Sequence, residues 1–327
     1  MKQFNNGTIK TAFFGTHDFA ATILQAMIND PQISVDLVIT QPDKPTGRSR
    51  KLQPPPIKTI ALQHNIKIAQ PTDLKSYALN LMPYALGVTA QYGLIIPQTI
   101  FNAPKYGTLN VHASLLPKYR GASPIQSALM NGETETGVTI MKMDAGLDTG
   151  PIILQKTIAI DPDETYPELE KKLVKIGSAA LLEAVPKYIS GELPLTPQDN
   201  SQATVCKQLT REDGKVDWRK SAREIYNQYR GLTPWPGIWT IWNGKRLKLL
   251  AVKAQDFAPP QHTPPQHTPP QHTPDTPGKV SVENDKIYIG CGGSAIEVMD
   301  LQLEGKKTMN VKNFLNGFAK IKNAELQ

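Results

Sequence analysis

The stretch TIKTAFFGTHDFAATILQAMINDPQISVDLVIT, from Thr8 to Thr40, decides the fold class. Residues 8–15 form an apolar run that predicts a buried strand. Residues 19–30 then place apolar side chains at the spacing of an amphipathic helix, which ends before Pro31. Residues 33–40 form a second strand-like run. Strand, helix and strand in this order predict a βαβ unit with a parallel sheet.

The same alternation continues as far as residue 189. Further apolar runs predict strands at residues 66–70, 85–90, 107–112, 136–143 and 151–160. A helical pattern then covers Tyr166 to Ile189, and Gly191 follows as a stop signal. Residues 1–189 are therefore predicted to form an α/β domain with a Rossmann-like, mostly parallel sheet.

The remainder of the chain has a different pattern. Residues 190–207 are polar, contain prolines and show no clear period, so they are predicted to link two domains. Beyond them, two alternating runs flank Asn243 and Gly244, the dipeptide of a tight β-hairpin. Short strand-like runs follow. Residues 208–327 are therefore predicted to form a small, OB-like β-barrel, an architecture that often binds nucleic acid.

A repeated pentapeptide interrupts this second domain. The motif PPQHT occurs three times in succession from Pro259 and contains three of the six histidines, His262, His267 and His272. A His-rich tract can bind metal, but nothing in this one can form a core. We therefore expect a disordered insertion at residues 259–277 that has no catalytic role.

The charge of the chain is unevenly divided. Residues 1–206 carry 18 Lys and Arg against 17 Asp and Glu, a net charge of +1. Residues 207–327 carry 18 against 12, a net charge of +6, which makes up most of the total of +7. This excess indicates either a polyanionic partner for the C-terminal domain or an ordinary basic surface, and charge alone leaves both open.

Composition and targeting signals indicate a cytoplasmic protein. The first residues, MKQFNNGTIKTAFFG, show neither the apolar segment of a signal peptide nor the Arg-rich pattern of a transit peptide. No apolar run approaches the ~20 residues that a membrane helix needs. The two cysteines, Cys206 and Cys291, have no CxxC or CxxH partner, so neither a disulfide framework nor a zinc site is expected.

Candidate catalytic residues follow one of the predicted strands. Asn110 and His112 end the run at residues 107–112, and residues two apart on a strand point to the same face. Ligands of open α/β sheets bind at the carboxyl ends of the strands. Amide and imidazole donors there would stabilise an oxyanion, with Asp144 or Asp148 orienting the imidazole. Because no Ser or Cys nucleophile accompanies them, direct transfer to an external nucleophile is expected.

Motifs for other chemistries are missing from the sequence. The turn after the first strand, FFGTHDFA, contains a single glycine and no GxGxxG. The chain also has no Walker A motif and no HExxH. Nicotinamide, nucleoside triphosphate and zinc-peptidase chemistry are therefore not predicted.

Two stretches together resemble a known enzyme family. LNVHASLLPKYRGASPIQ, residues 109–126, and GVTIMKMDAGLDTGPII, residues 137–153, resemble the 10-formyltetrahydrofolate-dependent formyltransferases. The resemblance is most extensive to the members that act on initiator tRNA, and it covers nearly the whole chain. The further stretches that carry it are FFGTHDFA, VITQPDKPTGRSRKLQPPPIK, AQYGLIIP, REDGKVDW, LTPWPG and GKKTM.

The resemblance implies a reaction and a set of site residues. The reaction is transfer of formyl from the co-substrate 10-formyltetrahydrofolate to the α-amine of methionyl initiator tRNA, by a monomer without metal, in the bacterial cytoplasm. The catalytic residues implied are Asn110, His112 and Asp148. The implied folate-binding residues are Ser114, Leu115, Leu116, Pro117, Tyr92 and Gly93. Arg48, Arg50 and Lys51, in a basic loop, are implied to bind the tRNA.

The sequence departs from the family pattern in two places. His17 stands where the family motif usually has proline, so the first turn is expected to differ slightly, without a catalytic role for the imidazole. The PPQHT repeat is an insertion that the family does not lead us to expect. It falls between strands of the predicted barrel and is expected to affect only local tRNA contacts.

Three other functions share parts of this pattern. A glycinamide ribonucleotide formyltransferase would end near residue 200, without the basic second domain. A sugar-nucleotide formyltransferase shares the C-terminal barrel architecture but lacks the KPTGR-type basic loop. A non-catalytic RNA-binding protein on the same fold would have no need for Asn110, His112 and Asp148.

Overall fold

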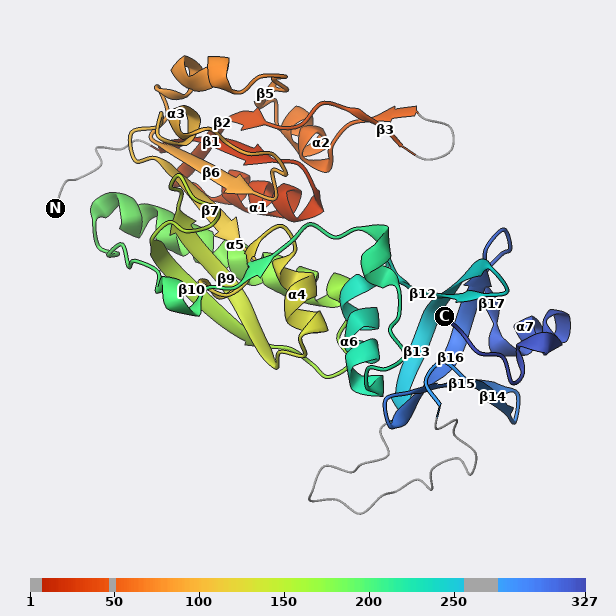
Figure 1. Ribbon diagram of the computed structural model, residues 1–327. Coiled ribbons are helices and arrows are strands. Elements are labelled where there is room, and N and C mark those ends of the chain that lie inside the picture. Colours follow the sequence, from red (N-terminus) through yellow and green to blue (C-terminus); the bar gives the residue numbers. More distant parts are fainter. Residues whose placement is uncertain (1–7, 47–50, 256–275) are drawn as a thin grey trace. The chain divides into compact units, whose positions relative to one another are not determined.

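The computed structural model describes residues 8–46, 51–255 and 276–327 (Figure 1). The predicted tRNA-binding residues Arg48 and Arg50, and most of the PPQHT segment, lie outside these residues. The chain divides into two compact units. Unit 1 comprises Met1–Pro124, Glu135–Ile160 and Glu168–Lys207, and unit 2 comprises Ile125–Thr134, Asp161–Pro167 and Gln208–Gln327.

Unit 1 follows the predicted alternation of strands and helices. Its elements are β1 (Ile9–Gly15), α1 (Asp18–Asn29), β2 (Ile33–Ile39), β3 (Lys44–Thr46), β4 (Lys51–Gln53), α2 (Pro56–Gln63), β5 (Lys67–Ala69), the 3₁₀ helix η1 (Lys75–Leu81), β6 (Leu86–Ala90), α3 (Gln98–Phe101), β7 (Thr108–His112), β8 (Arg120–Gly121), β9 (Glu135–Lys142), β10 (Ile152–Ala159), α5 (Tyr166–Ser190), the 3₁₀ helix η2 (Asn200–Gln202) and β11 (Val205–Cys206). Helix α5 enters unit 1 at Glu168.

A seven-stranded sheet forms the centre of unit 1. Its order is β10-β9-β7-β6-β1-β2-β5. The pairings from β7 to β5 are parallel, and those of β9 with β7 and β10 are antiparallel. Phe13 and Phe14 of β1 are fully buried, as is typical of a strand covered on both faces. The predicted Rossmann-like, mostly parallel sheet is confirmed.

The loops after three neighbouring strands meet at the carboxyl edge of this sheet. The carbonyl oxygen of Tyr92, which follows β6, accepts hydrogen bonds from Thr16 Oγ1 over 2.8 Å and from Gln41 Nε2 over 2.7 Å. Thr16 follows β1 and Gln41 follows β2. The neighbouring strand β7 ends at His112. The sheet therefore brings the candidate catalytic strand and the Tyr92 loop to one edge.

The segment predicted as a linker, residues 190–207, is instead part of unit 1. Val205–Cys206 pairs in parallel with Arg120–Gly121, and the amide of Arg120 donates to the carbonyl of Thr204 over 2.9 Å. The polar composition that indicated a linker reflects side chains that find partners within the unit. The sequence also did not predict that residues 125–134 and 161–167 belong to unit 2.

Unit 2 contains the antiparallel strands expected for the second domain. Its elements are α4 (Pro124–Met130), which enters the unit at Ile125, the 3₁₀ helix η3 (Arg211–Gly214), α6 (Ala222–Leu232), β12 (Ile238–Trp242), β13 (Lys245–Gln255), β14 (Val280–Glu283), β15 (Lys286–Cys291), β16 (Ser294–Leu303), β17 (Met309–Asn310), α7 (Val311–Gly317) and the 3₁₀ helix η4 (Ala319–Ile321). The hairpin predicted at Asn243 and Gly244 joins β12 to β13, and both residues have positive φ, as a tight hairpin turn requires.

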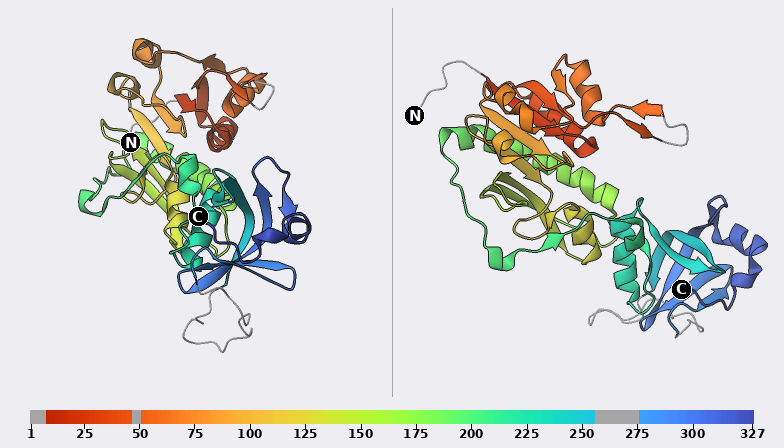
Figure 2. Two further views of the ribbon diagram at one scale, coloured as in Figure 1. Left: turned by 45° about the vertical axis from the view of Figure 1, so that its right-hand side comes forward. Right: turned by 45° about the horizontal axis from the view of Figure 1, so that its top comes forward.

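The strands of unit 2 form an open sheet and not the closed barrel that the sequence predicts. The order is β12-β13-β16-β15-β14, with β17 paired to β16, and among the described strands no pairing joins β12 to β14. Register shifts near Ala251 mark bulges in the long strand β13, which curves with its neighbours (Figure 2). The last residues bond to both edges instead: Ala324 and Leu326 to the β14 side, and Gln327 to Ile241 of β12.

The core of unit 2 is built largely from aromatic and aliphatic side chains. Helix α6 begins with a capping box, in which Ser221 and Glu224 each bond the other's backbone amide. Trp242 packs against Phe314, with ring centroids 5.9 Å apart. Leu326 is buried in the same cluster with 5% of its surface exposed. The C-terminal residues therefore complete the core and also bond both edges of the open sheet.

Within the three described ranges, no helix combines the length and the apolar composition needed to cross a lipid bilayer.

Leu326→Ala should destabilise unit 2, because it removes a buried side chain where the C-terminal residues close the core. We expect the free energy of unfolding to fall by about 2–4 kcal/mol. All four tryptophans lie in residues 208–327, so their fluorescence during urea unfolding reports on this unit. Glu325→Ala, at an exposed neighbouring position, is the control and should change the value by at most about 0.5 kcal/mol. Equal stability of the two variants would show that the C-terminal residues do not close the core.

Candidate active site

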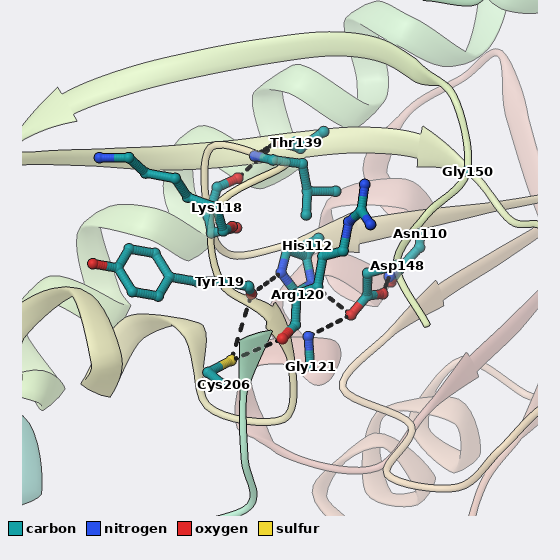
Figure 3. Close-up of polar contacts among 12 residues, drawn as sticks. Asn110, His112, Lys118, Tyr119, Arg120, Gly121, Thr139, Asp148, Gly150 and Cys206 are labelled. Atoms are coloured by element: carbon teal, nitrogen blue, oxygen red, sulfur yellow. Dashed lines mark hydrogen bonds and ion pairs between the residues drawn. The ribbon is translucent and has the colours of Figure 1, made fainter. Parts of the chain in front are cut away.

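Asn110, His112 and Asp148 converge at the carboxyl end of β7 (Figure 3). Nδ2 of Asn110 donates to Oδ1 of Asp148 over 3.1 Å. Oδ2 of the same carboxylate lies 3.6 Å from Nδ1 of His112. Asp148 belongs to the loop between β9 and β10, 38 residues from Asn110 in the sequence. The structure therefore brings together the three side chains singled out in the sequence.

Both ring nitrogens of His112 face oxygen atoms that accept hydrogen bonds. Nε2 lies 2.9 Å from the carbonyl oxygen of Tyr119. Because a carbonyl oxygen can only accept, Nε2 carries a proton and donates it to this bond. Nδ1 faces the Asp148 carboxylate at a distance slightly too long for a direct hydrogen bond. The ring is only 6% exposed, so these neighbours fix its orientation.

The carboxylate of Asp148 is held from three sides. Oδ1 accepts from Asn110, while Oδ2 accepts from the backbone amide of Gly121 over 2.9 Å and also faces His112. The backbone of Asp148 has φ +52°, in the left-handed region that Asp tolerates better than most residues. Two residues further on, Gly150 lies so close to the carbonyl oxygen of Lys142 that a Cβ on residue 150 would collide with this oxygen.

Asp144, the other acidic candidate of this loop, has a different set of contacts. Its Oδ1 accepts from the backbone amide of Gly146 over 3.1 Å and from Thr149 Oγ1 over 2.6 Å. These bonds turn the loop between β9 and β10 back on itself. Asp144 therefore shapes the loop, and Asp148 is the carboxylate that the structure places beside the imidazole.

A short strand pair positions the partners of His112 and Asp148. Tyr119 supplies its carbonyl to the imidazole, and Gly121 supplies its amide to the carboxylate. The pairing of β8 with β11 holds these residues, and Cys206 Sγ lies 3.3 Å from the carbonyl oxygen of Arg120. Gly121 has φ +117°, and a Cβ there would collide with the carbonyl oxygen of Cys206. The sequence did not indicate these contacts, because backbone atoms carry no residue-type signal.

The predicted folate-binding residues Ser114, Leu115, Leu116 and Pro117 form a turn that is tied to the sheet. Ser114 Oγ donates to the carbonyl of Lys118 over 2.7 Å. Thr139 Oγ1 donates to the carbonyl of Ser114 over 2.7 Å and accepts from the amide of Leu116 over 3.1 Å. Ser114 and Leu116 are buried, whereas Leu115 and Pro117 are half-buried and partly reach solvent. Thr139 was not identified from the sequence.

Tyr92 and Gly93 follow β6, the strand beside β7. Among the described residues, the buried Tyr92 hydroxyl has no hydrogen-bond partner. Burial raises the pKa of Tyr92 to about 12, so the phenol remains neutral at physiological pH. The next two residues, Leu94 and Ile95, are exposed. The Tyr92 side chain thus packs in the core of unit 1, and the two residues after Gly93 present apolar side chains to solvent.

The remaining sequence candidates lie apart from these contacts or outside the described residues. Lys51 is exposed on β4 and pairs with Thr46 of β3, whereas Arg48 and Arg50 lie outside the described residues. His17 is exposed and precedes α1 in extended conformation, without a side-chain capping bond. In the part of the chain that the structure describes, no group of three or more His, Cys, Asp or Glu could hold a metal ion.

The arrangement supplies donors and a carboxylate at one point. The Asn110 amide has two N–H groups, of which one bonds Asp148 and the other remains available to a substrate oxygen. Nδ1 of His112 lies 3.6 Å from the Asp148 carboxylate and can donate when the ring is protonated on both nitrogens. Such donors stabilise an oxyanion as a carbonyl becomes tetrahedral.

Comparisons with known proteins cover most of the chain. Residues 9–185 match the family described as formyl transferase, and residues 208–319 match the formyl transferase C-terminal domain. The methionyl-tRNA formyltransferase of Caldicellulosiruptor saccharolyticus is 41% identical over 320 residues, which covers 96% of this chain and 98% of the relative. That of Halalkalibacterium halodurans is 41% identical over 94% of this chain and 95% of the relative.

Solved structures of lower identity share the fold. The sugar 3N-formyl transferase WlaRD, solved in the presence of dTDP and 5-N-formyl-THF, aligns with a TM-score of 0.63 at 22% identity over 92% of this chain and 100% of its own. HypX from Aquifex aeolicus, solved in complex with tetrahydrofolic acid, aligns with a TM-score of 0.61 at 15% identity over 96% of this chain and 48% of its own. Given the relatives that match over nearly their whole length, this chain belongs to the methionyl-tRNA formyltransferase family of formyl transferases.

Proposed function

We propose that this protein transfers the formyl group of 10-formyltetrahydrofolate to the α-amine of methionyl initiator tRNA, the formylation used in translation initiation. The observation that carries the proposal is the convergence of Asn110, His112 and Asp148 without a nucleophilic side chain among them. It is supported by relatives of this named activity that are about 40% identical over most of the chain.

Asn110 and His112 act as donors in the proposed reaction. The methionyl amine attacks the formyl carbon directly, and negative charge develops on the formyl oxygen. The free N–H of Asn110 and the Nδ1–H of His112 would donate to this oxygen. Asp148 holds the Asn110 amide, balances the charge of the imidazolium and is placed to accept a proton from the attacking amine. The folate amine leaves with a proton, so charge and protons balance.

The folate site is proposed at the Ser114–Pro117 turn and the Tyr92–Gly93 loop. The Thr139 bonds make the turn rigid, which suits a surface that must orient the formyl group. The exposed Leu94 and Ile95 of the second loop offer apolar side chains to a flat ring. Structural neighbours solved with 5-N-formyl-THF and with tetrahydrofolic acid support a folate-derived donor. The residues found here therefore fit such a donor.

The tRNA is proposed to contact two basic regions. The net charge of +6 in residues 207–327 would attract the phosphate backbone. Arg48, Arg50 and Lys51 are proposed to contact the acceptor end of the tRNA, which carries the methionyl ester. Of these three, the structure describes Lys51, whose exposed position on β4 is compatible with a phosphate contact.

A formyl donor with two alternative acceptors tests the proposed function. The protein should produce N-formylmethionyl-tRNA from methionyl initiator tRNA and leave a dTDP-linked amino sugar unmodified. The sugar acceptor is the relevant control because the structural neighbours include a sugar 3N-formyl transferase and a protein described as a likely sugar N-formyltransferase, at 22% identity or less. Formylation of the sugar alone would assign the protein to that class. Binding of tRNA without formylation of either acceptor would favour the non-catalytic alternative.

Measuring tRNA affinity at several salt concentrations tests whether basic residues bind the phosphate backbone of the tRNA. Each neutralised phosphate contributes a slope of about −0.7 to −0.9 in log K against log salt, so tRNA affinity should weaken steeply. Affinity that is independent of salt would contradict phosphate binding by the basic residues.

Asn110→Ala should reduce kcat by about 10²–10³-fold, because it removes one donor to the developing oxyanion. Affinity for the folate donor should change little. Asn102→Ala is the matched control, since Asn102 is an exposed asparagine of the same unit that follows α3. Single-turnover rates and donor affinity measured in parallel separate the two effects. If Asn110→Ala kept the kcat of the Asn102→Ala control, Asn110 would not be a catalytic donor.

A further inference from the structure

The side chain of Gln198 connects two parts of unit 1 beside the active site. Its Nε2 donates to the carbonyl oxygen of Asp148 over 2.8 Å and to that of Gly150 over 2.7 Å. Its Oε1 accepts from Arg120, through Nε over 3.0 Å and through a terminal nitrogen over 2.8 Å. One amide group therefore uses both its donors and its acceptor in four hydrogen bonds.

Arg120 is the other half of this connection. It is 7% exposed and comes from β8, between the two residues that supply backbone atoms to His112 and Asp148. The terminal guanidinium nitrogen that bonds Gln198 also donates to Oδ1 of Asn200 over 2.8 Å. The planar guanidinium thus holds two side chains of the 198–200 segment at once, a geometry that a lysine cannot reproduce.

The loop that these bonds hold has an unusual backbone. Asp148 has φ +52°, and such conformations persist where the surrounding structure determines them. The bonds from Gln198 fix the carbonyls of Asp148 itself and of the residue two positions further on. The amide of Gly121 fixes the Asp148 side chain separately. Backbone and side chain of the same residue are therefore held by different partners.

We propose that Gln198 and Arg120 are positioning residues for the formyl transfer, which hold the Asp148 carboxylate at Asn110 and His112 through the backbone of its loop. This inference rests on the function proposed above. Gln198 touches no catalytic side chain and would act only through Asp148. A shift of about 1 Å in a reacting group can cost on the order of 10²-fold in rate, so a connection of this kind affects turnover.

Two substitutions of Gln198 separate its bonds. Gln198→Ala removes all four and should lower kcat by about 10–100-fold, with KM for both substrates within about twofold of the parent. Gln198→Glu keeps the acceptor for Arg120 but replaces the donor with a carboxylate that faces two carbonyl oxygens. It should therefore be as harmful as alanine. Gln202→Ala is the matched control, because this exposed glutamine of the same segment contacts Asp199 instead. Its kcat should equal that of the parent.

A double-mutant cycle distinguishes positioning from a general structural role. If Gln198 acts through Asp148, then Gln198→Ala should cost little further activity in an Asp148→Asn background, because the group that it positions is already impaired. Multiplied losses would overturn the proposal. So would a Gln198→Ala variant with the kcat of the Gln202→Ala control.

Hydrogen exchange gives a readout that does not depend on the reaction. Amides of residues 144–150 should exchange faster in Gln198→Ala and Arg120→Lys than in the parent, and at the parental rate in Gln202→Ala. Unchanged exchange in both variants would overturn the proposed connection even if formylation is observed. An inactive parent with the predicted exchange pattern would instead refute the proposed function alone.

Discussion

The parallel pairing of β8 with β11 is the constraint on which the candidate active site depends. Three consecutive residues of this segment serve the site in different ways: the Tyr119 carbonyl bonds the imidazole, the Arg120 side chain holds Gln198, and the Gly121 amide bonds the Asp148 carboxylate. Backbone hydrogen bonds hold this segment against residues 204–206, from the Arg120 amide to the Thr204 carbonyl and from the Ala122 amide to the Cys206 carbonyl. The position of a few backbone atoms therefore determines the geometry of the proposed chemistry.

This construction suits a reaction without a covalent enzyme intermediate. When the nucleophile comes from a substrate, the protein contributes donors, a carboxylate and fixed positions. His112 is buried between two acceptor oxygens, and Asp148 is held by separate backbone and side-chain bonds. The bound substrates would meet groups that need not rearrange during the reaction. This preorganisation is the physical basis of the proposed catalysis.

The sequence predicted the features of this structure that depend on residue type. It did not predict the features that depend on backbone contacts. The runs at residues 8–40 predicted a buried strand, a helix and a second strand, and the resemblance implied Asn110, His112 and Asp148, whose side chains lie together in the structure. Residue patterns left Asp144 and Asp148 equivalent, because their loop contacts depend on tertiary structure. The polar pattern of residues 190–207 predicts a linker, since a polar side chain that bonds buried carbonyls is indistinguishable in sequence from a solvated one. The predicted barrel closure also depends on contacts between strands and not on their pattern.

Turnover of Gly121→Ala, compared with that of Gly191→Ala, tests whether the pairing of β8 with β11 sets the geometry of the site. Both glycines of unit 1 have positive φ, so both variants bear a backbone penalty, but only at Gly121 does the new Cβ collide with the carbonyl of Cys206. With folding checked by thermal unfolding, we expect a loss in kcat of about 10²-fold for Gly121→Ala and parental kcat for Gly191→Ala. Parental kcat in a folded Gly121→Ala protein would contradict the claim that this strand pair sets the geometry of the site.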